Sequence, residues 1–145
     1  MGYSTSNPEQ VVDTMIDLTR LSNLHRAIVA GQGSLELYLA LRRRGFVRVA
    51  TTATCRLPKR QHAVGLITGQ NSLSAIETAL AQIAPFLGPS AAVAVLIDSH
   101  ESGVCLKIRS LLEQMGFRIE AGVRCQQGLV PSAYRHGFNQ MEIAA

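Results

Sequence analysis

Residues 26–45 of this chain read RAIVAGQGSLELYLALRRRG, and this stretch decides the fold. The run Arg26 to Ala30 is typical of a short buried strand, and the glycine-containing turn Gly31–Ser34 follows it at once. Leu35 to Arg44 then predicts a helix, which Gly45 ends. A strand joined through a glycine turn to a helix is typical of an α/β domain with a parallel sheet.

The alternation of strand and helix continues along the rest of the chain. Further strands are predicted over 46–51, 62–68, 91–97, 117–125 and 134–143, and further helices over 8–24, 73–86 and 104–115. Gly88-Pro89 is predicted to break the third of these helices, and residues 1–6 to be flexible. The last two strands leave no room for a helix between them, so they predict a long-looped antiparallel hairpin at a sheet edge. The expected fold class is α/β: a three-layer αβα Rossmann-like sandwich, with a mostly parallel sheet and a C-terminal antiparallel hairpin.

Length and composition limit the class of protein. A chain of 145 residues favours one domain over 1–145, and 47% apolar with 17% charged residues excludes intrinsic disorder. The longest aliphatic run, Ala91 to Ile97, is far shorter than the roughly 20 apolar residues of a membrane span. Three separated cysteines suit reduced thiols, and scattered histidines form no zinc pattern. We therefore expect a cytoplasmic protein without a metal site or a membrane partner.

Arginines account for much of the net charge of +4. One group is Arg42 to Arg44 with Arg48, and a second is Arg56, Lys59 and Arg60. We interpret the first group chiefly as the basic end of a helix, where cations offset the partial negative charge of the carbonyl groups. Phosphate or nucleic-acid binding is the less favoured alternative, because the chain has no Trp and only three Tyr for base stacking.

A ligand site in an open α/β sheet lies beyond the carboxyl ends of the strands, near the point where strand order reverses. The loops predicted to leave those ends supply the candidate binding residues, which are Gly31, Gln32, Gly33, Ser34, Thr51, Thr52, Thr68 and Asn71. Small and polar residues suit a cleft, but turns need them even where no ligand binds. Asp98-Ser99-His100 at a fourth strand end contains triad residue types, yet adjacent residues cannot easily reach triad geometry, so no catalytic residue is assigned.

The turn Gly31-Gln32-Gly33-Ser34 is the sharpest local signal. Glycine lets a ligand approach the backbone, and the N-terminus of the following helix offers free N–H donors. However, Glu36 occupies the third glycine position of the G-x-G-x-x-G fingerprint, and its charge would repel a pyrophosphate. A dinucleotide site is therefore disfavoured.

From Arg26 onward the order of elements resembles the class I S-adenosylmethionine-dependent methyltransferases. Ala30–Gly33 is similar to the glycine-rich motif of that family, and Phe86–Pro89 before Ala91–Ile97 is similar to its leader and strand. Leu111–Phe117 is similar to the helix-to-strand junction that precedes the hairpin. The resemblance implies S-adenosylmethionine as a candidate cofactor: Gly31 and Gly33 would shape the methionine end of its site, and Thr51 or Thr52 would contact the ribose.

Three departures from the family pattern concern the same site. Val29 and Thr51 or Thr52 stand where the family usually has acids, and only ten residues, 52–61, replace its helix, strand and helix. The first hypothesis is thus a catalytically degenerate domain that binds a small molecule or a protein partner, with a homodimer through the N-terminal helix as one form. The alternative is an active S-adenosylmethionine-dependent methyltransferase on a small substrate, with Thr68 to Asn71 facing the acceptor and Asn71 or His100 orienting it.

Overall fold

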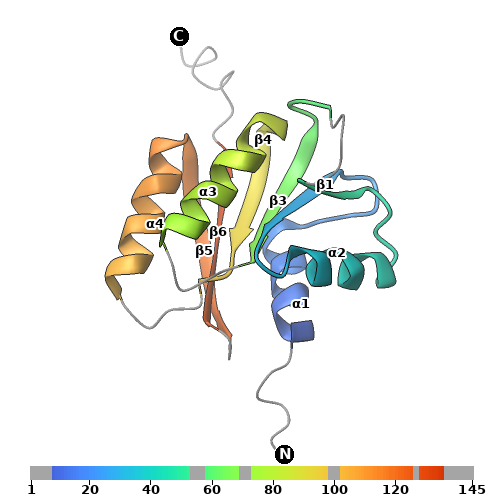
Figure 1. Cartoon of the computed structure of the whole chain (residues 1–145), viewed down its shortest axis with the longest axis horizontal. Coiled ribbons are helices and arrows are strands. Elements are labelled where there is room, and N and C mark those ends of the chain that lie inside the picture. Colours follow the sequence, from blue (N-terminus) through green and yellow to red (C-terminus); the bar gives the residue numbers. More distant parts are fainter. Residues whose placement is uncertain (1–7, 53–57, 69–72, 98–101, 126–127, 136–145) are drawn as a thin grey trace, which may run out of the picture.

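The computed structural model describes residues 8–52, 58–68, 73–97, 102–125 and 128–135. Its strands form one six-stranded sheet with the order β2-β1-β3-β4-β6-β5 (Figure 1). In chain order the elements are α1 (Pro8–Thr19), β1 (Ala27–Gly31), α2 (Ser34–Arg43), β2 (Val49–Thr51), β3 (His62–Thr68), α3 (Leu73–Ile83), the 3-10 turn η2 (Ala84–Phe86), β4 (Leu87–Val95), α4 (Ser102–Gln114), β5 (Phe117–Cys125) and β6 (Gly128–Arg135). None of the described helices is long and apolar enough to cross a membrane.

The strand directions confirm the predicted sheet. β1 pairs parallel with both β2 and β3, and β3 pairs parallel with β4. β6 pairs antiparallel with both β4 and β5, which closes the sheet with the predicted hairpin. Because β2 lies on one side of β1 and β3 on the other, the strand order reverses between β1 and β3. The carboxyl ends of these two strands therefore form the switch point at which α/β sheets bind ligands.

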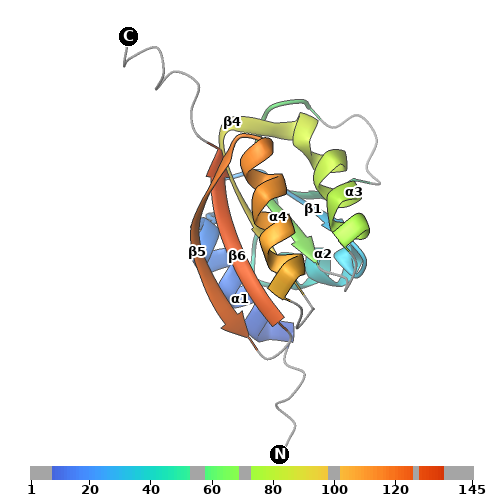
Figure 2. The same cartoon turned by 90° about the vertical axis from the view of Figure 1, so that its left-hand side faces the viewer.

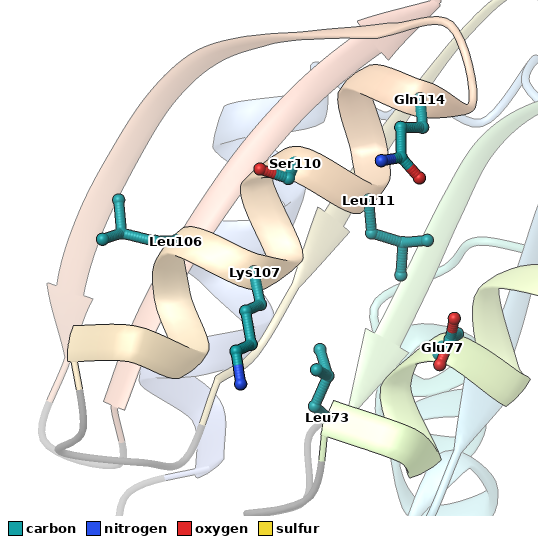
Figure 3. A pocket seen from close by; sticks show the side chains of 7 residues that line it. All are labelled: Leu73, Glu77, Leu106, Lys107, Ser110, Leu111 and Gln114. Carbon is teal, nitrogen blue, oxygen red and sulfur yellow. The ribbon is translucent and has the colours of Figure 1, made fainter.

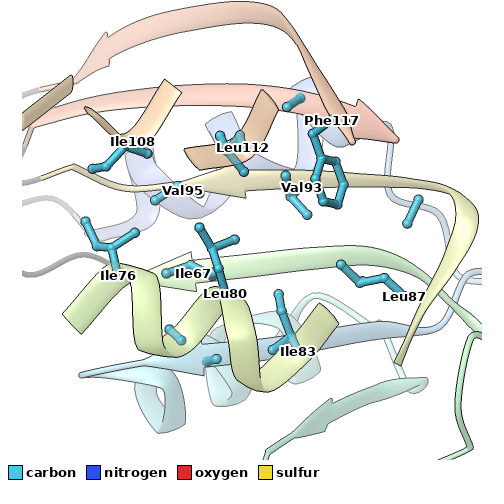
Figure 4. Close-up of a cluster of buried hydrophobic side chains, with 14 of the residues drawn as sticks. Ile67, Ile76, Leu80, Ile83, Leu87, Val93, Val95, Ile108, Leu112 and Phe117 are labelled. Carbon is cyan, nitrogen blue, oxygen red and sulfur yellow. The ribbon is translucent and has the colours of Figure 1, made fainter. Parts of the chain in front are cut away.

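Side chains that alternate along the strands belong to two separate hydrophobic cores, one on each face of the sheet. On one face, Ala27 and Val29 of β1 belong to a buried cluster with Met15 of α1 and Leu41 of α2. On the other face, Ile28 belongs to a second cluster, whose members on α3 and α4 are Ile76, Ala79, Leu80, Ile83, Ile108 and Leu112 (Figure 4). Figure 2 shows α1 and α4 on opposite sides of β6. Helices cover both faces, so the αβα sandwich is confirmed.

The N-terminal helix is shorter than predicted, and its apolar face is used within the chain. α1 ends at Thr19 rather than near residue 24, because Arg20 adopts a left-handed φ of 56° and the Leu21 N–H donates to the Ile16 carbonyl at 3.1 Å. Val12 and Met15 are 4% and 0% exposed in the core of the same chain. This apolar face is therefore not free to pack across a dimer.

Two strands begin at residues that differ from the prediction. β2 starts at Val49 rather than at residue 46, because Gly45 (φ 95°) closes α2 and the Phe46 N–H still donates to the Leu41 carbonyl at 3.1 Å. β4 starts at Leu87 and includes Gly88-Pro89, which therefore does not separate helix from strand as predicted. Regular pairing of β4 with β3 begins only at Ala92, close to the predicted start of the strand.

The hairpin is tighter than predicted. β6 spans Gly128–Arg135, whereas the sequence predicted a loop there and a strand over 134–143; residues 136–145 lie outside the described part of the chain. Pro131 suggested the loop, yet it lies inside β6 opposite Gly122 of β5. Proline has no N–H, and the pairing of β6 with β4 is interrupted there, between Ala94↔Ser132 and the bridge Ile97↔Leu129.

Candidate functional site

The described carboxyl ends of three parallel strands lie at one edge of the sheet, as the sequence predicts. Gly31 at the end of β1 lies in register with Thr68 at the end of β3, and Thr51 at the end of β2 pairs with Val29. The turn Gly31–Ser34 thus stands between the two threonines. Two further predicted features, Asn71 and the segment 98–100, lie outside the described residues.

Gly31 packs directly on the neighbouring strand. Its φ is 101°, and a Cβ added there would overlap the Thr68 carbonyl oxygen and lie 3.1 Å from the Thr68 Oγ1. A side chain would therefore meet both backbone strain and a rigid backbone atom. The approach of β3 to β1 already requires glycine at position 31, whether or not a ligand binds.

Thr68 ties the glycine turn to β3. Its hydroxyl donates to the Gln32 carbonyl oxygen, and the Ala30 carbonyl oxygen lies 3.4 Å from the same Oγ1. Ala30 and Gln32 flank Gly31, so one side chain of β3 holds both sides of this glycine. The threonine thereby spans the switch point between the two strands. Sequence reasoning singled out Thr68 as a residue facing an acceptor and missed this bridging role.

The start of α2 carries donors and a carboxylate close together. Gly33 adopts a left-handed φ of 82° before α2 begins at Ser34, and no side chain caps the first turn. Uncapped N–H groups attract anions. However, a Glu36 carboxylate oxygen lies 3.7 Å from the place where a Cβ on Gly33 would stand, so its negative charge lies over the same turn. This arrangement disfavours a phosphate, as the sequence indicated.

The ribose position of a nucleoside cofactor has no carboxylate at the end of β2. Thr51 is half-buried and Thr52 is exposed. A carboxylate accepts hydrogen bonds from two ribose hydroxyls at once, whereas a threonine hydroxyl is a weaker and less directional acceptor. Connecting residues 58–61, the described part of the segment between β2 and β3, add no helix or strand to this edge. The described residues at the end of β2 therefore offer hydroxyls rather than a carboxylate to the nucleoside part of S-adenosylmethionine.

The cavities lined by described residues include a groove on the outer side of two helices. It has a volume of about 290 Å³ and lies between α3 and α4. Figure 3 shows Lys107 and Leu111 of α4 and Leu73 of α3 lining it from its two sides. Its walls carry no group of metal ligands; indeed, no cluster of three or more His, Cys, Asp or Glu occurs among the residues that the structure describes.

A buried histidine, His62, lies at the start of β3, where the amino-terminal ends of the parallel strands form the opposite edge of the sheet. It is 3% exposed, its Nδ1 lies 3.2 Å from the Phe86 carbonyl oxygen, and its ring meets the Phe86 ring edge-on at 6.3 Å. Burial lowers the pKa of His62 below 6.5, the hydrogen bond to Phe86 opposes this shift, and the charge of Arg26 adds to it. These contacts give His62 a packing role at the edge remote from the glycine turn.

Comparisons with known proteins support the fold rather than a particular activity. No family model matches the chain, and no curated protein matches it. Among solved structures, it is similar to precorrin-6y C5,15-methyltransferase from Geobacter metallireducens GS-15, with 14% identity over 93% of this chain and 94% of that chain and a TM-score of 0.63.

Two further solved structures are similar to the chain. Ribosomal protein L11 methylase from Lactobacillus delbrueckii subsp. bulgaricus is 16% identical over 88% of this chain and 79% of that chain, with a TM-score of 0.63. Geranyl diphosphate C-methyltransferase from Streptomyces coelicolor A3(2), solved with Mg2+, geranyl diphosphate and S-adenosyl-L-homocysteine, is 8% identical over 89% and 79%, with a TM-score of 0.57. The chain therefore has the Rossmann-like fold of the class I S-adenosylmethionine-dependent methyltransferases.

Proposed function

We propose that this chain is a methyltransferase-like domain that does not transfer methyl groups and that binds a small ligand or a partner protein. The observation that carries the proposal is the contact between the glycine turn and β3. Thr68 bonds the Gln32 carbonyl, and Gly31 packs on the backbone of β3. Gly31, which would line a cofactor site, thus serves a contact between strands.

The missing carboxylate at the end of β2 supports the same proposal. Two hydrogen bonds to a charged acceptor contribute roughly 1.5–3 kcal/mol each, so their loss weakens nucleoside binding by several powers of ten. Thr51 and Thr52 offer hydroxyls instead. The two described cysteines, Cys105 and Cys125, are free thiols, which fits the reducing cytoplasm that we propose as the location.

The alternative is an active S-adenosylmethionine-dependent methyltransferase on a small substrate. It is favoured by the left-handed Gly31 and Gly33 before an uncapped helix, and by the fold shared with methyltransferases. Here these glycines would hold the methionine end of the cofactor, and Thr51 would contact the ribose. Methyl transfer depends mainly on alignment of the two reacting atoms, so a sparse site could still act.

Isothermal titration calorimetry with S-adenosylmethionine and S-adenosylhomocysteine separates these functions. A methyltransferase of the same fold, titrated in parallel, controls for the quality of both ligands. We expect no binding tighter than about 1 mM, an affinity that corresponds to roughly −4 kcal/mol. A low-micromolar dissociation constant for either ligand would contradict the proposal and favour the active enzyme.

A further inference from the structure

Helix α2 exposes an unusual mixture of side chains. Its exposed residues are Leu35, Glu36, Leu39, Arg42 and Arg43, while Leu37, Ala40 and Leu41 face the core. Leu35 and Leu39 are 63% and 44% exposed, and they lie one turn apart on the same side of the helix. The middle of the exposed face is therefore apolar. Val47, whose carbonyl accepts a hydrogen bond of 3.0 Å from Arg42, is 62% exposed.

The two exposed arginines of α2 differ in their surroundings. The Arg42 guanidinium bonds the Val47 carbonyl and lies 5.9 Å from the centre of the Tyr38 ring, so it is drawn to one flank of the helix. Arg43 points to the opposite flank, which it shares with Glu36, two helical turns away. Neither Glu36 nor Arg43 forms an ion pair among the residues that the structure describes.

Glu36 and Arg43 cannot pair with each other within one helix. Seven residues at 1.5 Å each separate them by about 10 Å along the axis, beyond the reach of an ion pair. Arg44, by contrast, forms an ion pair of 3.0 Å with Asp13 of α1. Glu36 and Arg43 are thus available for ion pairs with another molecule. Such a partner would need an arginine or lysine opposite Glu36 and a carboxylate opposite Arg43, with the same spacing between them.

We propose that this partner is a second copy of the chain, with the two α2 helices packed antiparallel about a twofold axis near Leu39. In a twofold contact each surface meets itself, and residues on one flank of an antiparallel pair meet residues on the same flank. Glu36 of each copy then faces Arg43 of the other, which forms two equivalent ion pairs. Leu39 packs on its symmetry mate, and Leu35 packs on the aliphatic part of Arg42.

The proposed contact is small, and its small area implies a weak dimer. A single helix face of 10 residues buries less than the 1,200 Å² or so below which protein interfaces are weak and transient. We therefore expect a reversible monomer–dimer equilibrium, with a dissociation constant on the order of 10–100 μM, rather than an obligate dimer. This inference does not depend on the proposed function, since the contact is made by side chains of α2 and needs no ligand at the glycine turn.

Sedimentation equilibrium over a range of concentrations around that value tests the proposal. We expect Leu39→Asp to weaken dimerisation at least about tenfold, because it places two carboxylates at the axis. Leu106→Asp on α4, where the leucine is 63% exposed against 44% for Leu39, is the control and should leave the equilibrium unchanged. Each variant is first checked for an unchanged thermal unfolding transition.

Charge reversal provides the sharper test. E36R and R43E should each weaken the dimer several-fold, because each brings two like charges together at both ends of the contact. The double variant E36R/R43E exchanges the charges and should restore the affinity to within about threefold of the wild type. A monomer at every concentration, a dimer insensitive to Leu39→Asp, or a double variant that fails to recover would overturn the proposal.

Discussion

Replacing Gly31 by alanine distinguishes a glycine needed for packing from a glycine needed for a ligand. The substitution places a Cβ against the Thr68 carbonyl oxygen at a φ of 101°. The left-handed backbone costs an alanine about 1–2 kcal/mol, and overpacking against a backbone atom typically costs about 1–3 kcal/mol more. We expect Gly31→Ala to lower the free energy of unfolding by about 3 kcal/mol, which at this chain length lowers the Tm by about 10 °C.

Gly45 provides the control, because it has nearly the same backbone and no neighbour. Its φ is 95°, and nothing lies within 4 Å of an added Cβ. Gly45→Ala therefore measures the backbone cost alone, and we expect a loss of about 1 kcal/mol. The difference of about 2 kcal/mol between the two variants is the cost of the close approach of β1 to β3.

Urea unfolding of both variants, followed by circular dichroism, measures these free energies. A Gly31→Ala variant as stable as Gly45→Ala would refute the reasoning, because the strands would then not need the close approach. A stable Gly31→Ala variant that loses binding of S-adenosylmethionine would further show that the glycine serves a cofactor.

Three other predictions concern polar side chains. Thr68→Val removes the hydroxyl that holds the Gln32 carbonyl, and should cost about 1 kcal/mol and speed hydrogen exchange in the turn 31–34; unchanged exchange would count against the bridge. The lowered pKa of His62 means that the unfolded chain binds its proton more readily, so stability should be full above pH 6.5 and fall as pH drops below 6.5. His62→Gln should flatten this dependence in urea unfolding. Ser132 is 2% exposed and its hydroxyl has no hydrogen-bond partner among the described residues, so Ser132→Ala should keep or raise the Tm, and a clear loss would reveal a partner.

The fold could be predicted from local signals. The apolar run Ala91–Ile97 is too apolar for a half-exposed strand, and the turn at Gly31 joins a strand to a helix. Each signal lies within a few residues, and together they imply the αβα sandwich that the structure confirms. The fold also brings Gly31, Thr51 and Thr68 to one edge, because the carboxyl ends of parallel strands meet there.

Two element boundaries were predicted wrongly from local sequence patterns. Pro131 signals a loop, but β5 on one side and the interrupted pairing with β4 on the other let it lie in a strand. Arg20 gives no sign in the sequence of the left-handed conformation that ends α1. The place of Pro131 depends on contacts between strands that a local pattern does not contain.

The contact between the glycine turn and β3 could not be predicted from the sequence, because it too depends on residues far apart in the chain. Gln32 and Thr68 are 36 residues apart, and their hydrogen bond depends on the register Gly31↔Thr68 between two strands. The sequence has the same glycine at position 31 whether the absence of a side chain makes room for a ligand or for a neighbouring strand. That Gly31, Gln32, Gly33, Ser34, Thr51, Thr52, Thr68 and Asn71 bind a ligand stays a prediction.

An NMR titration with S-adenosylhomocysteine, read at the backbone amides of Gly31, Gln32, Gly33 and Thr51, reports on this edge of the sheet residue by residue. If the glycine turn serves contacts with β3 rather than a cofactor, these four resonances should stay in place up to about 1 mM ligand, equivalent to a binding free energy no better than roughly −4 kcal/mol. Saturable shifts of these same amides at micromolar ligand would contradict the account.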